Sequence, residues 1–310
     1  MEENYSVILG PTASGKSSLA MELAAEMRGE IVSADSAQVY KYMDIGTAKP
    51  TIKEQANVPH HLIDVVLPSE EFSVFDFQKL SQKVIKDIKK RDNHPIVVGG
   101  TGLFIRALTE DFTLVSIPED KAIRKKYQDM ADEKGNHYIH SLLKNRDDNA
   151  YNKLHPNDYR RVIRALEVYE LSGKSIYELQ RRNQFASNIT NINFYGLYMD
   201  RQRLYTQINN RVDQMIEDGL VTEVSELLKQ GISKDCNALK AIGYRQVVMY
   251  LENQIDFDEM VRLIKRDTRR YAKRQLTWFR NMDNIKWYNL DNLNINQVKE
   301  KIIKQMQENG

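Results

Sequence analysis

The stretch Gly10-Pro11-Thr12-Ala13-Ser14-Gly15-Lys16-Ser17 has two glycines separated by four residues, followed by a lysine and a hydroxyl residue. This spacing is typical of phosphate-binding loops. Residues 5–9 form a short apolar and β-branched run, and residues 17–27 are rich in strong helix formers at helical spacing. We therefore expect a buried strand, a glycine turn and a helix whose first amides face a bound phosphate.

Two side chains of this loop suit a phosphate ligand in addition to the backbone. Lys16 supplies a positive charge, and the Ser17 hydroxyl is placed to hold a Mg²⁺ ion that bridges the phosphates. The alternative interpretation is a glycine turn before an ordinary helix. Because the motif lies between a strand pattern and a helix pattern, the phosphate site is the better interpretation.

Length and composition restrict the class of protein. The chain has 310 residues, which is enough for two domains and a sizeable core. Its single cysteine, Cys236, excludes an internal disulfide framework and a multi-cysteine zinc site, and fits a reducing compartment. No apolar run approaches membrane-spanning length, and the first strand pattern begins within five residues of Met1, which leaves no room for a signal peptide. We expect a cytoplasmic protein that does not enter a membrane.

Strand and helix patterns alternate along the first part of the chain. Further short strands are expected at residues 30–35, 60–66, 96–98 and 194–199, and an outer helix at 75–92. The fold class we predict is α/β, a P-loop NTPase-like parallel sheet flanked by helices, with an inserted all-helical domain. The core should span 1–117 and 194–310, with a helical part toward the C-terminus, and the insertion 118–193. We expect residues 36–59 to form a long surface segment and the chain after residue 201 to be helical to its end.

Two polar residues are expected at the carboxyl edge of this sheet, where ligands of open parallel sheets bind. Asp35 ends the second predicted strand, and Thr101 follows the glycines after the strand at 96–98. Asp35 lies beside the phosphate site if the first two strands are neighbours. A helix-cap or turn role for Asp35 fits the sequence equally well.

Basic residues gather in two places. Residues 266–280 contain six cations and three aromatic rings in fifteen residues, a composition that suits phosphate backbones and stacked bases. The alternative is an amphipathic helix whose Tyr271, Trp278 and Phe279 belong to the core. In the insertion, residues 157–164 carry three arginines on a helix pattern, which indicates either an anion-binding face or ordinary solvated charge.

Two functions are compatible with these residues. The first is a small-molecule kinase that uses the glycine loop for ATP. The second is a transferase that acts on RNA and binds a diphosphate in the same loop. The kinase has the more common motif behind it. However, the basic stretch at 266–280 and the inserted domain have no explanation in a small-molecule kinase, so the residues alone leave both functions open.

Seven segments of the chain resemble, in order, those of the bacterial tRNA dimethylallyltransferases, also called tRNA isopentenyltransferases. The segments run nearly from end to end: 10–17, 33–40, 44–50, 60–64, 98–103, 241–244 and 268–280. One departure is Ala37, where many members carry methionine.

The resemblance implies transfer of the dimethylallyl group of dimethylallyl diphosphate to N6 of adenosine 37, beside the tRNA anticodon, with Mg²⁺ assisting. It implies that residues 10–17 bind the donor, that Asp35 is the general base, and that Thr101 helps to position it. Lys16 and Arg211 would grip the diphosphate. The protein should act as a monomer. The residues that the resemblance places against tRNA are Asp35, Ser36, Ala37, Gln38, Thr101, Arg124, Arg160, Arg161, Arg164, Gly243, Tyr244, Arg245, Lys273, Arg274, Trp278 and Arg280.

Overall fold

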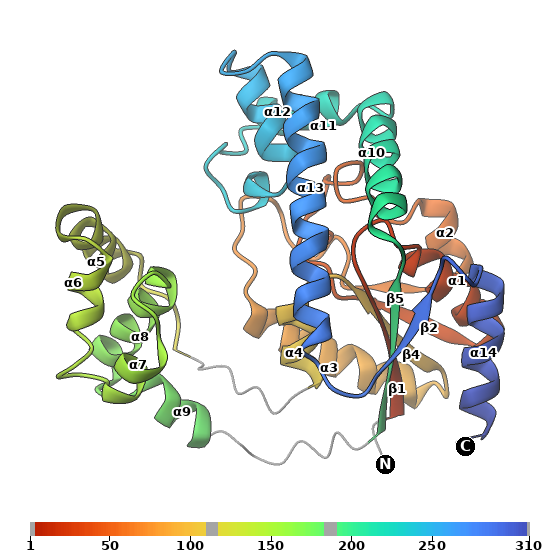
Figure 1. Ribbon diagram of the computed structural model, residues 1–310, viewed down its shortest axis with the longest axis horizontal. Helices are drawn as coiled ribbons and strands as arrows, with labels where there is room; N and C mark the ends of the chain where they lie inside the picture. The colour runs from red at the N-terminus through yellow and green to blue at the C-terminus, as the bar shows by residue number, and fades with distance from the viewer. Residues whose placement is uncertain (1–3, 110–116, 183–190, 309–310) are drawn as a thin grey trace. The chain divides into compact units, whose positions relative to one another are not determined.

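The structure, a computed structural model, describes residues 4–109, 117–182 and 191–308. The chain divides into two compact units, which are residues 1–109 with 189–310, and residues 110–188 (Figure 1). In the described part of the chain, no helix is both long and apolar enough to cross a membrane.

The first unit is built on a parallel sheet with the strand order β3-β2-β4-β1-β5-β6. β1 is central, with Val7 opposite Val97 of β4 on one side and Phe194 of β5 on the other. The inner strands are apolar along their whole length because helices cover both faces. This sheet confirms the predicted α/β class. The strands are β1 (Asn4–Leu9), β2 (Gly29–Ser33), β3 (His60–His61), β4 (His94–Gly99), β5 (Asn191–Tyr198) and β6 (Ile285–Asn289).

Alternate residues of the strands point into two different cores. Ile8 packs on one face with α1 and α14, whereas Val7 and Leu9 pack on the other face with α3 and α4. The rings of Phe77 in α3 and Phe104 in α4 stack with their centroids 4.1 Å apart. These layers hold the strand ends, and the loops that follow them, in a rigid frame. The covering helices are α1 (Lys16–Met27), α3 (Val74–Lys90), α4 (Gly102–Thr109) and α14 (Ile295–Glu308).

Four further helices form a bundle with its own core at the end of the sheet where β5 leads into α10 (Figure 1). Val39, Tyr40 and Met43 are buried in this core, so the expectation that residues 36–59 form a surface segment is wrong for this part. The same segment also contains a short helix, α2 (Ile52–Asn57). The bundle comprises α10 (Arg201–Glu217), α11 (Leu220–Lys229), α12 (Tyr244–Leu251) and α13 (Phe257–Arg280), with a 3-10 turn at Ala238–Lys240.

The second unit contains helices and no strand within its described residues, as expected for a helical insertion. Tyr127, Ile139, Leu143 and Val162 are fully buried in a core that belongs to this unit alone. Its helices are α5 (Lys121–Lys134), α6 (Asn136–Ser141), α7 (Asp148–Lys153), α8 (Tyr159–Ser172) and α9 (Ile176–Arg182).

Two expectations about strands are wrong. The chain is not helical to its end, because β6 adds a sixth strand beside β5 after α13. The strand expected at residues 60–66 is reduced to His60–His61, since Leu62 and Asp64 adopt positive φ values of 62° and 54° and turn the chain away from the sheet.

Candidate functional site

The glycine loop has the geometry of an anion site. Gly10 has a φ of 149°, and a side chain there would meet the carbonyl oxygen of Leu197 at 2.7 Å, so only glycine fits. Gly15 is the N-cap of α1 in the left-handed conformation and has no side chain to cap the helix. The first-turn amides of α1 are therefore available to a negatively charged ligand.

Ser14 adds a second indication of a ligand at this loop. Its side chain is buried, and its Oγ has no hydrogen-bond partner among the described residues. Buried hydroxyls in folded proteins are nearly always hydrogen-bonded. An oxygen-rich ligand seated on the loop would supply the missing partner.

Three of the predicted catalytic side chains, Lys16, Arg211 and Asp35, lie close enough to interact electrostatically. Burial, together with the positive charge of Arg211, lowers the pKa of Lys16 to about 7, and the negative charge of Asp35 opposes this effect. Burial also lowers the pKa of Arg211, again opposed by Asp35. The Nζ of Lys16 donates a hydrogen bond of 2.6 Å to the carbonyl of Pro11. Two partly buried cations that repel each other favour the binding of an anion between them.

Asp35 reaches this site although β4 lies between β1 and β2, so the neighbouring strands on which we based its position are not neighbours. A side chain at Gly99, the end of β4, would overlap the backbone of Ala34. Glycine at this position lets the chain after β2 cross the edge of β4 toward the loop. Asp35 Oδ1 accepts a hydrogen bond of 2.8 Å from the Ala37 amide, so the carboxylate also caps a turn.

Thr101 connects the end of β4 to the segment that carries Asp35. Its Oγ1 accepts a hydrogen bond of 3.1 Å from the Ser36 amide and lies 3.3 Å from the Ser36 hydroxyl. Tyr271 of α13 lies close to Thr101, and burial together with the charge of Asp35 raises the pKa of Tyr271 to about 12. The sequence did not point to this hydroxyl, because Tyr271 looked like one of several stacking or core aromatics.

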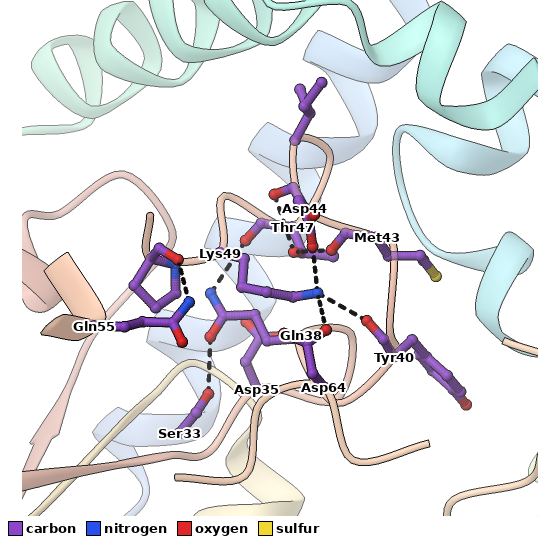
Figure 2. A network of polar contacts seen from close by, with 12 residues as sticks. Ser33, Asp35, Gln38, Tyr40, Met43, Asp44, Thr47, Lys49, Gln55 and Asp64 are labelled. Carbon is purple, nitrogen blue, oxygen red and sulfur yellow. Dashed lines mark hydrogen bonds and ion pairs between the residues drawn. The ribbon is translucent and has the colours of Figure 1, made fainter. Parts of the chain in front are cut away.

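Gln38 holds the segment after Asp35 in place, as Figure 2 shows. Its Oε1 accepts a hydrogen bond of 2.9 Å from Ser33 Oγ, and its Nε2 donates to the carbonyls of Thr47 and Ala48 at 3.3 and 3.2 Å. The side-chain amide is therefore already occupied within the protein. Ser36 and Ala37, which directly precede Gln38, remain candidates for RNA contact.

Lys49 fixes the next turn of the same segment (Figure 2). Its side chain is only 3% exposed, and its Nζ contacts Asp44 at 2.5 Å and Asp64 at 2.7 Å. It also donates a hydrogen bond of 2.9 Å to the carbonyl of Tyr40. A buried lysine needs such partners, which is why this stretch keeps one shape.

Tyr244 has no exposed surface, so its side chain is not available to tRNA in this structure, and tRNA binding by this residue stays a prediction. Its hydroxyl donates a hydrogen bond of 2.6 Å to Glu223, whose carboxylate also accepts from the amides of Asp44 and Ile45. Burial, with the neighbouring Glu223 carboxylate, raises the pKa of Tyr244, so the hydroxyl keeps its proton. Gly243 is buried as well. Tyr244 and Glu223 together tie the bundle to the turn at 44–46.

Arg245, the third residue predicted in this segment, is exposed and pairs with Asp267 at 2.9 Å. It therefore keeps surface that a polyanion could reach.

Two of the four arginines predicted for tRNA in the insertion have a structural role. Arg124 Nε and Arg164 Nη1 lie 3.0 and 2.6 Å from Glu167, which is fully buried. A buried carboxylate without partners would be strongly destabilising, so both cations are needed there. Arg160 and Arg161 are exposed, and Arg161 pairs with Asp158 at 3.4 Å. These two remain candidates for RNA contact.

Lys273, Arg274 and Arg280 are exposed on α13, and among the described residues no acidic side chain lies within ion-pair distance of them. Asp267, nearer the start of the basic stretch, pairs with Arg266 at 2.8 Å. The basic surface is thus concentrated in the last two turns of α13. A cavity of about 260 Å³ between α10 and α13 is lined by Met199, Arg201, Leu204, Tyr205, Lys273, Leu276, Thr277 and Arg280.

The aromatic residues of α13 belong largely to the core, as the alternative interpretation proposed. Phe279 is fully buried, and Trp278 is half-buried against Gly102, where a side chain would overlap its indole ring. Trp278 therefore offers RNA only part of one ring.

Comparison with known proteins places the chain in a family. A family model described as IPP transferase matches residues 38–282. The chain belongs to the IPP transferase family. A tRNA dimethylallyltransferase of Carboxydothermus hydrogenoformans is 48% identical over 303 residues, covering 98% of this chain and 97% of that relative. A relative of the same name from Acetivibrio thermocellus is 47% identical over 304 residues, covering 98% and 96%.

Solved structures of IPP transferases agree with this assignment. The full-length tRNA isopentenylpyrophosphate transferase of Bacillus halodurans is 42% identical, has a TM-score of 0.72, and the match covers 99% of this chain and 98% of that chain. A eukaryotic dimethylallyltransferase acting on tRNA is 31% identical with a TM-score of 0.79, covering 92% of this chain and 73% of that chain.

A divalent cation fits this IPP transferase site only if the ligand brings most of the coordinating oxygens. Among the described residues, no group of three or more His, Cys, Asp or Glu side chains could hold a metal ion. Ser17 is exposed in the first turn of α1, beside the loop. One protein hydroxyl combined with phosphate oxygens and waters is a usual way to hold Mg²⁺.

Proposed function

We propose that this protein transfers the dimethylallyl group of dimethylallyl diphosphate to N6 of adenosine 37 in tRNA and releases diphosphate. The observation that carries the proposal is the convergence of Lys16, Arg211 and Asp35 beside a loop with free helix amides and an orphan buried hydroxyl. The relatives named tRNA dimethylallyltransferase support the same reaction.

The loop side of the site would hold the donor. Its diphosphate would lie on the first amides of α1, between Lys16 and Arg211. When the bond between the first allylic carbon and oxygen breaks, its electron pair goes to the diphosphate, and these fixed charges stabilise the negative charge that develops. Mg²⁺, held by the Ser17 hydroxyl and the donor's own oxygens, would neutralise part of the same charge.

The other side of the site would hold the acceptor adenine, which must leave its stack to enter a protein pocket. N6 forms a new bond to the first allylic carbon and loses one proton, which the Asp35 carboxylate accepts. Thr101 and the neutral hydroxyl of Tyr271 lie next to Asp35 and would orient its carboxylate. Such proton transfer contributes about 10²–10⁴-fold to a rate.

The RNA would be held mainly through its phosphates. Lys273, Arg274 and Arg280 present charge that no described carboxylate neutralises, and Arg160 and Arg161 present charge on the insertion. We propose that the protein acts as a monomer. We place it in the cytoplasm, where its substrate tRNA is found.

The competing function, a small-molecule kinase, would use the same loop for ATP. The reported relatives and solved structures carry the names of tRNA-modifying transferases, so prenyl transfer is the better supported function. Mass spectrometry of nucleosides, after tRNA is incubated with the protein, Mg²⁺ and dimethylallyl diphosphate, separates the two. We expect a prenylated adenosine without ATP, and much less of it with Lys16→Met. An ATP-dependent phosphorylated product would reject the proposal.

A further inference from the structure

Gln275 is a buried residue of α13 whose side chain points away from the neighbouring exposed cations Lys273 and Arg274. It is 5% exposed. Its Oε1 accepts a hydrogen bond of 2.8 Å from the Thr12 amide, and its Nε2 donates one of 2.9 Å to the carbonyl of Gly100. Because an amide N–H must donate and a carbonyl must accept, these two partners fix the orientation of the side chain.

The two partners of Gln275 lie in the two loops that the reaction must bring together. Thr12 belongs to the loop after β1, which would hold the diphosphate. Gly100 precedes Thr101, which holds the Ser36 amide beside Asp35. One side chain therefore bridges the donor loop and the acceptor loop. A side chain at Gly100 would overlap Nε2 of Gln275, so this bridge has no spare room.

Tyr271, one turn earlier in α13, supports the bridge from the same helix. The Tyr271 side chain lies close to both Gln275 and Thr101. The helix that presents Lys273 and Arg274 on its outer face thus contacts both loops through its inner face.

We propose that Gln275 is a positioning residue that sets the spacing between the donor loop and the acceptor loop. The inference rests on the proposed function. Displacement requires the attacking N6 and the allylic carbon to lie about 3–3.5 Å apart and in line, and a misplacement of about 1 Å can cost about 10²-fold in rate. Gln275 acts on that distance through backbone groups and touches neither substrate.

Single-turnover measurements with saturating tRNA and dimethylallyl diphosphate test the inference. Gln275→Ala should slow transfer by about 10²-fold, with the dissociation constants of both substrates changed only a few-fold. The control is Gln78→Ala, which removes a 2.5 Å hydrogen bond from a glutamine in α3 to the carbonyl of Ala107 in α4, away from both loops. Gln78→Ala should keep the parent rate. A parent rate in Gln275→Ala, or a loss confined to the two dissociation constants, would overturn the inference.

Gly100→Ala gives a second, independent variant in case Gln275→Ala folds poorly. Its methyl group would displace the Gln275 amide, so it should slow transfer in the same way. In the double variant the methyl group occupies space that Gln275 has vacated, and the rate should be no lower than in the slower single variant. If the two losses instead multiply, the residues act independently and the bridge is not their shared role.

Hydrogen exchange of the free protein provides a readout without catalysis. The Thr12 amide is hydrogen-bonded by Gln275, so peptides covering residues 10–17 should exchange faster in Gln275→Ala than in the parent or in Gln78→Ala. Equal exchange would contradict the bridge. If the parent itself transfers no prenyl group, the proposed function and this role fall together, whereas an active parent with an equally active Gln275→Ala overturns only the role of Gln275.

Discussion

Asp35 combines a structural and a chemical task in one carboxylate. Its Oδ1 caps the turn at Ala37, and its charge acts on Lys16, Arg211 and Tyr271. Asp35→Asn keeps an oxygen for the turn and loses the basic group. We expect single-turnover transfer to fall by about 10²–10⁴-fold, while tRNA affinity and thermal stability stay near those of the parent. The control is Asp218→Asn, an exposed position at the end of α10. Near-normal transfer by Asp35→Asn would show that Asp35 only caps the turn at Ala37 and is not the general base.

Tyr244 shows why a residue within a recognisable motif need not meet the substrate. It is buried, and its hydroxyl binds the Glu223 carboxylate. Tyr244→Phe removes one hydrogen bond to a charged group, which should lower the free energy of unfolding by about 1.5–3 kcal/mol. The affinity for tRNA should not change. Chemical denaturation and a tRNA titration measure the two quantities, and a loss of affinity at unchanged stability would return Tyr244 to the RNA-binding surface.

At the scale of elements, α13 is the helix that we assign to RNA. Lys273→Ala combined with Arg274→Ala should weaken tRNA binding. The slope of log affinity against log salt concentration should flatten by about 1.5–2 units, because fewer phosphate contacts form and fewer counterions are released on binding. Affinity for dimethylallyl diphosphate should be nearly unchanged.

The matched control for α13 is Lys301→Ala combined with Lys304→Ala, which removes the same charge from α14. That pair should leave the slope close to the parent's. If the two double variants flatten the slope equally, net charge rather than the surface of α13 determines RNA binding.

The elements that could be predicted from the sequence are those with local causes. The phosphate loop depends on Gly10 and Gly15, and the alternation of strands and helices depends on periodicity within each segment. Burial of Met43 and Tyr244 could not be predicted, because it depends on helices that pack from distant parts of the chain. Likewise, β6 is a short run directly after a long helix, and only its pairing with β5 identifies it.

The predicted site shows the same limit. Lys16 and Asp35 follow strand ends, so their position at the carboxyl edge of the sheet could be predicted. The bridge by Gln275 could not be predicted, because it joins residues more than 170 positions apart in the sequence. The pairing of Arg124 and Arg164 with Glu167 was hidden for the same reason, since an exposed cation and a cation that neutralises a buried acid look alike in a sequence.

At the level of the whole molecule, two titratable groups of the core unit lower the free energy of unfolding as the pH falls. Burial, with a minor contribution from the charge of Lys89, lowers the pKa of His94 to about 4. Burial would raise the pKa of Glu30, but hydrogen bonds from Arg91, Asn93 and His61 outweigh it and lower this pKa to about 2. The unfolded chain therefore binds protons that the folded chain does not. The stability from His94 is complete above pH 6.5 and is lost as the pH falls toward 4, whereas that from Glu30 is complete above pH 4.5 and is lost toward 2.

Both tryptophans, Trp278 and Trp287, belong to the core unit, so their fluorescence follows its unfolding separately from the insertion. We expect the free energy of unfolding to drop by roughly 1–3 kcal/mol between pH 7 and pH 4. His94→Gln should flatten this dependence above pH 4.5, where Glu30 does not yet contribute. An unchanged slope in His94→Gln would show that other groups cause the loss.

The central claim, prenyl transfer to one adenosine, is tested most directly by mapping the product. An anticodon stem-loop RNA is incubated with the protein, Mg²⁺ and dimethylallyl diphosphate, cut with a nuclease, and its fragments are weighed by mass spectrometry. We predict one added dimethylallyl group, on N6 of adenosine 37 alone, matched by an equal amount of released diphosphate. Transfer to another position, or no transfer by folded protein with both substrates bound, would contradict it.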